Sequence, residues 1–193
     1  MMENYGNPSP YSGTAGELNA ELDKIVSYLE RGSHWHRQIA NELRKPSLSL
    51  RGFGRWHECE AKGDYSSIVC IEKIVRDKLN YDPKIDVSMI DQANNYMVNS
   101  VEDFKASFEL WISNEKALVE CLNKAVNASR TVDIQLYKDL MCLTDEVQCE
   151  IMRAGMAKSR LDAANWGSHD LYICSMMLHK HFEDSDSLDF TLS

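Results

Sequence analysis

The chain has 193 residues, of which 44% are hydrophobic and 26% are charged, with a formal net charge of -9 and a pI near 5.1. This length suits one folded domain with a sizeable core, and the composition is not that of a disordered or fibrous protein. The negative charge argues against nucleic acid and anionic membrane surfaces as partners, so cations are the more natural ligands.

The N-terminal residues do not resemble a secretory signal. Residues 1–15 lack a basic start followed by an apolar run, so we expect a flexible N-terminal segment there rather than a secretory signal. No stretch approaches the roughly 20 apolar residues of a membrane-spanning helix. The six cysteines include no CxxC pair. We therefore expect reduced cysteines and a cytoplasmic protein.

Apolar residues recur every three or four positions along the first third of the chain, which predicts helices with one buried face. The first predicted helix covers residues 16–43. Pro46 interrupts the pattern, and a second helix follows over residues 48–79. The connection is short, so these two helices should lie antiparallel.

The next segment, residues 80–89, has apolar residues in alternation at Ile85, Val87 and Met89, which predicts an extended crossover. Ser100 followed by Asp103 forms a capping box and predicts the start of a third helix, which continues to about residue 125. The crossover is too long for a tight turn between neighbouring helices.

A polar turn at residues 127–131 leads to a fourth predicted helix over residues 132–164. Ser168 then caps a shorter fifth helix over residues 169–182, and an acidic, mobile tail follows over residues 184–193. The sequence therefore predicts an all-α fold, with a single domain over residues 16–183. Four long helices with one long middle connection form an up-down-down-up bundle.

Four stretches resemble the ferritin family, in the family's order and at nearly its spacings. They are LRGFGRWHECEAKGD in the second helix, LWISNEKALVECLNKA in the third, EVQCEIMRAGMAKSRLDAAN in the fourth and DLYICSMMLHKHF in the closing helix. The resemblance implies a ferritin-like bundle, assembly into a hollow shell of twenty-four subunits, storage of iron as a ferric mineral, and a dinuclear site that oxidises ferrous iron.

A dinuclear iron site needs carboxylates, which stabilise the oxidised metal and bridge two ions, and an imidazole that fixes the geometry. The resemblance places the family's Glu-x-x-His pair on Asp64 and Ser67. The aspartate is one methylene shorter than glutamate, and serine is a poor ligand. His57 precedes Asp64 by two helical turns and does not supply the missing imidazole.

Three further ligand positions are implied by the resemblance. The first-helix glutamate falls on Leu29 by strict counting and on Glu30 after a one-residue adjustment. Glu115 matches the third-helix glutamate and lies on an apolar strip, where a lone carboxylate is costly without a cation. Gln148 lies at, or one place beyond, the family's fourth-helix glutamine. The expected metal ligands are therefore Glu30, Asp64, Glu115 and Gln148.

Other chemistry-bearing residues favour structural interpretations. The spacing of His57, Cys59 and Glu60 does not converge them on one face, so we expect a solvated helix surface there. His34 and His36 point in different directions, which predicts one exposed or interfacial ring and one packed ring. The cysteines with apolar neighbours are expected to be small core residues; they are Cys70, Cys121, Cys142 and Cys174.

The depleted ligand set limits the expected function. Glu150 would be an outer ligand only in a bacterial-type centre. We expect a cage subunit that binds and stores iron with weak or no ferroxidase activity, assembled alone or with ferroxidase-competent subunits. Two alternatives remain open: a non-iron cage with a structural or protective role, and a working dinuclear oxidase with unusual ligands.

Overall fold

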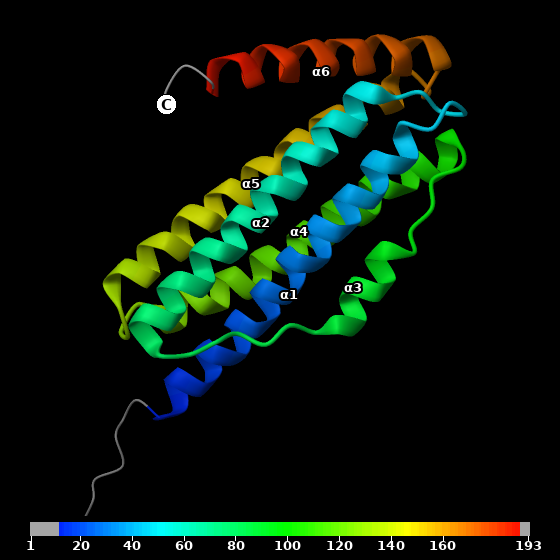
Figure 1. The fold of residues 1–193 in the computed structure, drawn as a ribbon. Coiled ribbons are helices and arrows are strands. Elements are labelled where there is room, and N and C mark those ends of the chain that lie inside the picture. Colours follow the sequence, from blue (N-terminus) through cyan, green and yellow to red (C-terminus); the bar gives the residue numbers. More distant parts are fainter. Residues whose placement is uncertain (1–11, 190–193) are drawn as a thin grey trace, which may run out of the picture.

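The structure, a computed structural model, describes residues 12–189 and is a bundle of helices without a strand in that range. Four long helices lie alongside one another, and a fifth lies across one end of the bundle (Figure 1). The helices are α1 (Ser12–Leu43), α2 (Arg51–Leu79), α3 (Val87–Asn94), α4 (Val101–Ser129), α5 (Ile134–Ala163) and α6 (Ser168–Asp189). The predicted all-α bundle with one long crossover and a closing helix is confirmed.

The chain ends of the described region are more helical than predicted. α1 begins at Ser12, so residues 12–15 of the expected N-terminal segment are helical, and residues 1–11 lie outside the described residues. α6 continues past residue 182 to Asp189, which makes residues 184–189 of the expected tail helical. None of the helices in the described part of the chain is long and apolar enough to cross a membrane.

The crossover contains a helix that the alternation of apolar residues did not predict. The expected extended segment is wrong from Val87 onward, because the Asp86 side chain accepts a hydrogen bond from the Ser88 backbone N–H and caps α3. The extended part is tied to α1 by Asp23, which accepts from the Tyr81 hydroxyl and the Lys84 N–H, each at 2.7 Å. α3 packs against α1.

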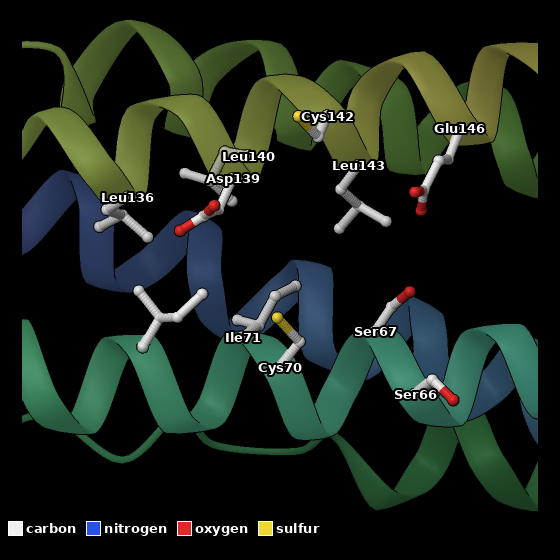
Figure 2. A pocket seen from close by; sticks show the side chains of 11 residues that line it. Ser66, Ser67, Cys70, Ile71, Leu136, Asp139, Leu140, Cys142, Leu143 and Glu146 are labelled. Atoms are coloured by element: carbon white, nitrogen blue, oxygen red, sulfur yellow. The ribbon is translucent and has the colours of Figure 1, made fainter. Parts of the chain in front are cut away.

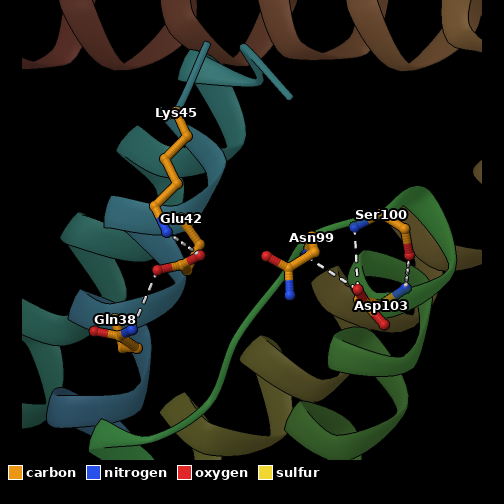
Figure 3. Close-up of polar contacts among 6 residues, drawn as sticks. All are labelled: Gln38, Glu42, Lys45, Asn99, Ser100 and Asp103. Carbon is orange, nitrogen blue, oxygen red and sulfur yellow. Dashed lines mark hydrogen bonds and ion pairs between the residues drawn. The ribbon is translucent and has the colours of Figure 1, made fainter. Parts of the chain in front are cut away.

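The capping box that begins α4 forms as predicted (Figure 3). The Asp103 N–H donates to the Ser100 hydroxyl oxygen at 3.1 Å, and the Ser100 N–H donates to the Asp103 carboxylate at 3.0 Å. The same view shows the end of α1, where the Glu42 carboxylate accepts from Gln38 and Lys45. Side-chain contacts of this kind replace the backbone partners that helix ends lack.

α6 lies against the start of α2 through a backbone contact. The Gly52 N–H donates to the Ser175 hydroxyl oxygen at 3.0 Å, and a Cβ on Gly52 would lie 1.7 Å from the Ser175 carbonyl oxygen. Only glycine allows the two helices to approach this closely.

The apolar core is divided into two halves. The half near the α2–α3 connection is aliphatic and includes Leu22, Ile25, Val75, Leu122 and Leu140. The half beneath α6 is rich in aromatic rings and includes Trp35, Phe53, Phe104, Phe108 and Trp166. The boundary between them falls at the middle of each long helix.

α2 packs loosely against α5, and a cavity of about 280 Å³ lies between them. Figure 2 shows Ser67 on α2 and Glu146 on α5 facing each other across it. Cys70 and Cys142 also line this cavity and are exposed, so their prediction as core residues is wrong. Cys121 is buried, as expected, and no disulfide forms among the described residues.

Candidate metal centre

A layer of carboxylates separates the two apolar halves of the core. Each of the four long helices contributes at least one carboxylate. On each helix it lies between the residues that belong to the aliphatic half of the core and those that belong to the aromatic half. Their charges act on one another throughout the set. We call these residues the carboxylate layer; they are Glu30 on α1, Glu60 and Asp64 on α2, Glu115 on α4, and Glu150 on α5.

Three members of the layer are buried, with Glu60 9% exposed, Asp64 7% and Glu115 5%. A buried carboxyl group prefers its neutral form, and a second negative charge nearby strengthens this preference. Burial, with a contribution from the Glu60 charge, raises the pKa of Glu115 to about 8. Burial followed by the charges of Glu60 and Glu115 raises the pKa of Glu150 to about 9. Several of these groups therefore hold protons at neutral pH.

Asp64 lies at the electrostatic centre of the layer. Its pKa is well above the usual value because of burial, then the charges of Glu115, Glu150, Glu60 and Glu30. A glycine on α1 makes room for its carboxylate, since a Cβ on Gly32 would lie 2.7 Å from Asp64 Oδ2.

Two carboxylate oxygens in the layer lack a partner. Asp64 Oδ2 and Glu115 Oε2 are buried and have no hydrogen-bond partner within the described part of the chain. Buried carboxylate oxygens are normally paired or bound to a cation, because desolvation without compensation is costly. These two atoms are the strongest sign that the layer accepts a ligand.

Glu60 is held at the edge of the layer by residues outside it. Trp56 Nε1 donates to Glu60 Oε1 at 2.5 Å, and Arg153 Nη2 lies 3.8 Å from the same oxygen. Burial raises the pKa of Glu60, while the Trp56 hydrogen bond and the Arg153 charge oppose that rise.

A buried histidine pair lies one helical turn from the layer. His36 Nδ1 and His57 Nδ1 are 2.7 Å apart, so one ring donates and the other accepts. The rings of Trp35 and Trp111 pack against both histidines. Burial lowers the pKa of His57 to about 3, and burial followed by the charge of His57 holds the pKa of His36 well below its usual value. Both rings are therefore neutral near pH 7.

The structure brings two of the four expected ligands together at the centre of the layer. Asp64 and Glu115 are buried there, whereas Glu30 is half-buried at the edge, with its Oε2 3.8 Å from His34 Nε2. Gln148 is exposed, and the layer residue on that part of α5 is Glu150. The solvated face expected for His57 and Glu60 is wrong, because both are buried.

A signal for Glu60 was present in the sequence. Trp56, Glu60, Asp64 and Ile68 follow one another at intervals of four residues, so they lie on one strip of α2. Residues that share a strip with a buried tryptophan and a buried isoleucine are themselves buried. The contact between His36 and His57 had no comparable signal, because it depends on the register between α1 and α2.

The layer is not a preformed coordination shell. Among the described residues, no three histidine, cysteine, aspartate or glutamate side chains converge closely enough to hold a metal ion in this conformation. Glu60 is engaged by Trp56 and Arg153, and part of the layer is protonated. A bound cation would have to displace protons and draw the carboxylates together.

Comparison with known proteins relates the chain to others through its fold. No protein-family model and no curated protein sequence matches it. An open pore ferritin from the archaeon Archaeoglobus fulgidus has a similar structure, with a TM-score of 0.67 and 15% identity over 90% of this chain and 98% of that one. An engineered closed form of that ferritin gives a TM-score of 0.68 and 14% identity over 90% and 97% of the two chains. A humanized archaeal ferritin gives 0.68 and 15% over 90% and 98%.

Proposed function

Since this chain has a ferritin-like fold with a carboxylate layer across its core, we propose that it is a cytoplasmic cage subunit that binds and stores iron. The observation that carries the proposal is the pair of buried oxygens without partners, Asp64 Oδ2 and Glu115 Oε2. Leaving a buried polar atom unsatisfied costs about 1–3 kcal/mol, which a bound cation would recover.

The donor atoms in the layer suit iron as the cargo. Carboxylate oxygens are hard ligands that favour divalent and trivalent cations over soft ones. In this proposal Asp64 and Glu115 bind the ion first, Glu60 joins them, and Glu150 completes the surroundings of the ion after losing its proton. Glu30 contributes from the edge, and the exposed Gln148 takes no direct part.

We assign the subunit weak or no ferroxidase activity of its own. Ser67 takes the place of the imidazole, and it lines the cavity between α2 and α5 rather than the layer. The two buried histidines beside the layer, His36 and His57, are hydrogen-bonded to each other. A site without imidazole, whose carboxylates must first lose protons, is poorly organised for fast oxidation of two iron ions.

Exposed apolar side chains on the outer surface support self-assembly. Patches of this kind commonly mark protein–protein interfaces. The large exposed ones on α5 and α6 are Ile134, Met141, Met152, Met156, Tyr172, Ile173, Met176 and Met177. The proposed assembly is a shell of twenty-four subunits, formed by this chain alone or together with ferroxidase-competent subunits.

A second candidate is a cage with a structural or protective role that does not take up iron. The observation that favours it is the lack of three converging ligands in the described residues. In this case the layer would stay protonated and serve only as a polar boundary within the core.

Sedimentation of the purified protein after aerobic addition of ferrous iron separates these possibilities. We expect a large particle whose ferric absorbance co-sediments with protein, and less iron per particle in an Asp64→Asn, Glu115→Gln double variant. A large particle free of iron would favour the structural cage. A small particle would contradict assembly into a shell.

A further inference from the structure

The carboxylate layer meets the surface at one side of the bundle, next to a basic residue. Glu150 lines a surface cavity of about 360 Å³ together with Glu146 and Arg153. Arg153 Nη2 lies 3.8 Å from Glu60 Oε1, so its guanidinium reaches from the cavity to a member of the layer. This cavity therefore connects the layer with solvent.

The guanidinium of Arg153 is loosely held. Its side chain is 54% exposed, while Glu60, its partner, is 10% exposed at the side chain. A separation of 3.8 Å is too long for a direct hydrogen bond, so the contact is an ion pair between an exposed guanidinium and a buried carboxylate. Glu60 is fixed instead by Trp56 Nε1, at 2.5 Å.

We propose that Arg153 is a resident counter-cation at the mouth of the carboxylate layer, which an incoming metal ion must displace. This inference rests on the proposed function, because it requires that the layer bind cations. The guanidinium supplies positive charge to the layer in the absence of metal. It also lines the surface cavity together with Glu150, so its departure removes the positive charge beside Glu60 and widens the opening to the layer.

The position of Arg153 on α5 argues for this role over that of an ordinary surface ion pair. Arg153 lies one turn after Glu150 on α5, and its guanidinium extends to Glu60 on the neighbouring helix α2. It also lines a second cavity of about 480 Å³ beneath α6, which gives the displaced side chain a place to go.

Luminescence of Tb³⁺ bound near tryptophan tests the inference without relying on iron oxidation. Trp56, which donates to Glu60, lies close enough to sensitise Tb³⁺ held by the layer. The Arg153→Gln variant should bind Tb³⁺ about tenfold more tightly than the unmodified chain, because one repulsive charge has been removed. Arg153→Lys, which keeps the charge, should stay close to the unmodified affinity.

Arg160→Gln is the matched control. Arg160 is on the same helix and lines the cavity beneath α6, but it is outside the cavity that contains Glu150. Its removal lowers the net charge equally and should change Tb³⁺ affinity by less than about twofold. Equal affinities for Arg153→Gln and Arg160→Gln, or weaker binding by Arg153→Gln, would overturn the assignment of Arg153.

The Asp64→Asn, Glu115→Gln double variant separates this inference from the proposed function. If the layer is the site, the variant loses tryptophan-sensitised Tb³⁺ binding while its circular dichroism shows a helical bundle. If it binds Tb³⁺ as tightly as the unmodified chain, the proposed site is wrong. A third outcome is that the double variant loses Tb³⁺ binding while Arg153→Gln shows no gain in Tb³⁺ affinity. That outcome would support the proposed site and refute only the role of Arg153.

Discussion

Glu115 shows how a single buried carboxyl group can couple stability to pH. Its pKa is about 8 in the folded protein, against 4.5 for an ordinary glutamate. Between these two values the folded state holds a proton that the unfolded state has released. Stability therefore falls as pH rises through this window, by about 1.4 kcal/mol per pH unit for each such group.

Replacing Glu115 with glutamine should remove its share of this dependence. We expect the free energy of unfolding of the metal-free Glu115→Gln variant to fall less steeply between pH 5 and pH 8 than that of the unmodified chain. Urea denaturation at several pH values measures the slope. Parallel profiles for the two proteins would show that Glu115 does not hold a proton in the folded state.

At the scale of one helix, α1 depends on a glycine that helix propensity alone would disfavour. A Cβ on Gly32 would lie 2.7 Å from Asp64 Oδ2, whereas a Cβ on Gly155 of α5 would meet no atom within 4 Å. Both residues lie inside long helices, so the intrinsic gain from alanine is similar at the two positions, about 1 kcal/mol.

The two glycines therefore make a matched pair. Gly155→Ala should raise the free energy of unfolding by roughly 0.5–1 kcal/mol, while Gly32→Ala should lower it because the Asp64 carboxylate must move. Thermal unfolding of the metal-free proteins compares them. An equal gain from both substitutions would mean that Asp64 has other room for its carboxylate.

The same scale shows what the sequence can and cannot predict. The period of apolar residues and the capping box at Ser100 predicted the four long helices, because these signals are local. The α3 helix was missed, because the cap at Asp86 outweighed an alternation of only three apolar residues. Asp64 and Glu115 were found through family resemblance, whereas Glu60 was misjudged from a spacing that ignored its strip on α2.

Contacts between helices were harder to predict. The membership of the layer depends on the axial register between helices that are far apart in the chain. No local sequence pattern fixes that register. The pairing of His36 with His57 and the approach of Arg153 to Glu60 belong to this class. The fold was therefore largely predictable from the sequence, but the composition of the layer was only partly so.

At the scale of the whole molecule, two sets of buried groups change the free energy of unfolding in opposite directions as pH changes. The carboxylate layer favours acid conditions, as argued for Glu115. The histidine pair favours the opposite, because His57 has a pKa of about 3 in the folded state and 6.5 in an ordinary environment. Below pH 6.5 the histidines of the unfolded chain bind protons, whereas the buried pair in the folded protein stays neutral. The free energy of unfolding therefore falls as pH falls.

In the metal-free protein the two effects therefore oppose each other on the acid side, between about pH 4.5 and pH 6.5, whereas above about pH 6.5 the carboxylate layer acts alone and stability falls as pH rises. Replacing both His36 and His57 by phenylalanine should make stability fall more steeply with rising pH on the acid side and leave the alkaline side unchanged. Denaturation profiles between pH 4 and pH 9 test the expectation. An acid side that keeps its slope in the double variant would assign it to other groups.

The division of the core into two halves affects how unfolding can be observed. All four tryptophans of the chain, Trp35, Trp56, Trp111 and Trp166, belong to the aromatic half beneath α6. Because these four rings all lie on one side of the carboxylate layer, opening of the aliphatic half alone would leave their surroundings intact. Indole fluorescence then reports the loss of one half alone, while circular dichroism sums over both.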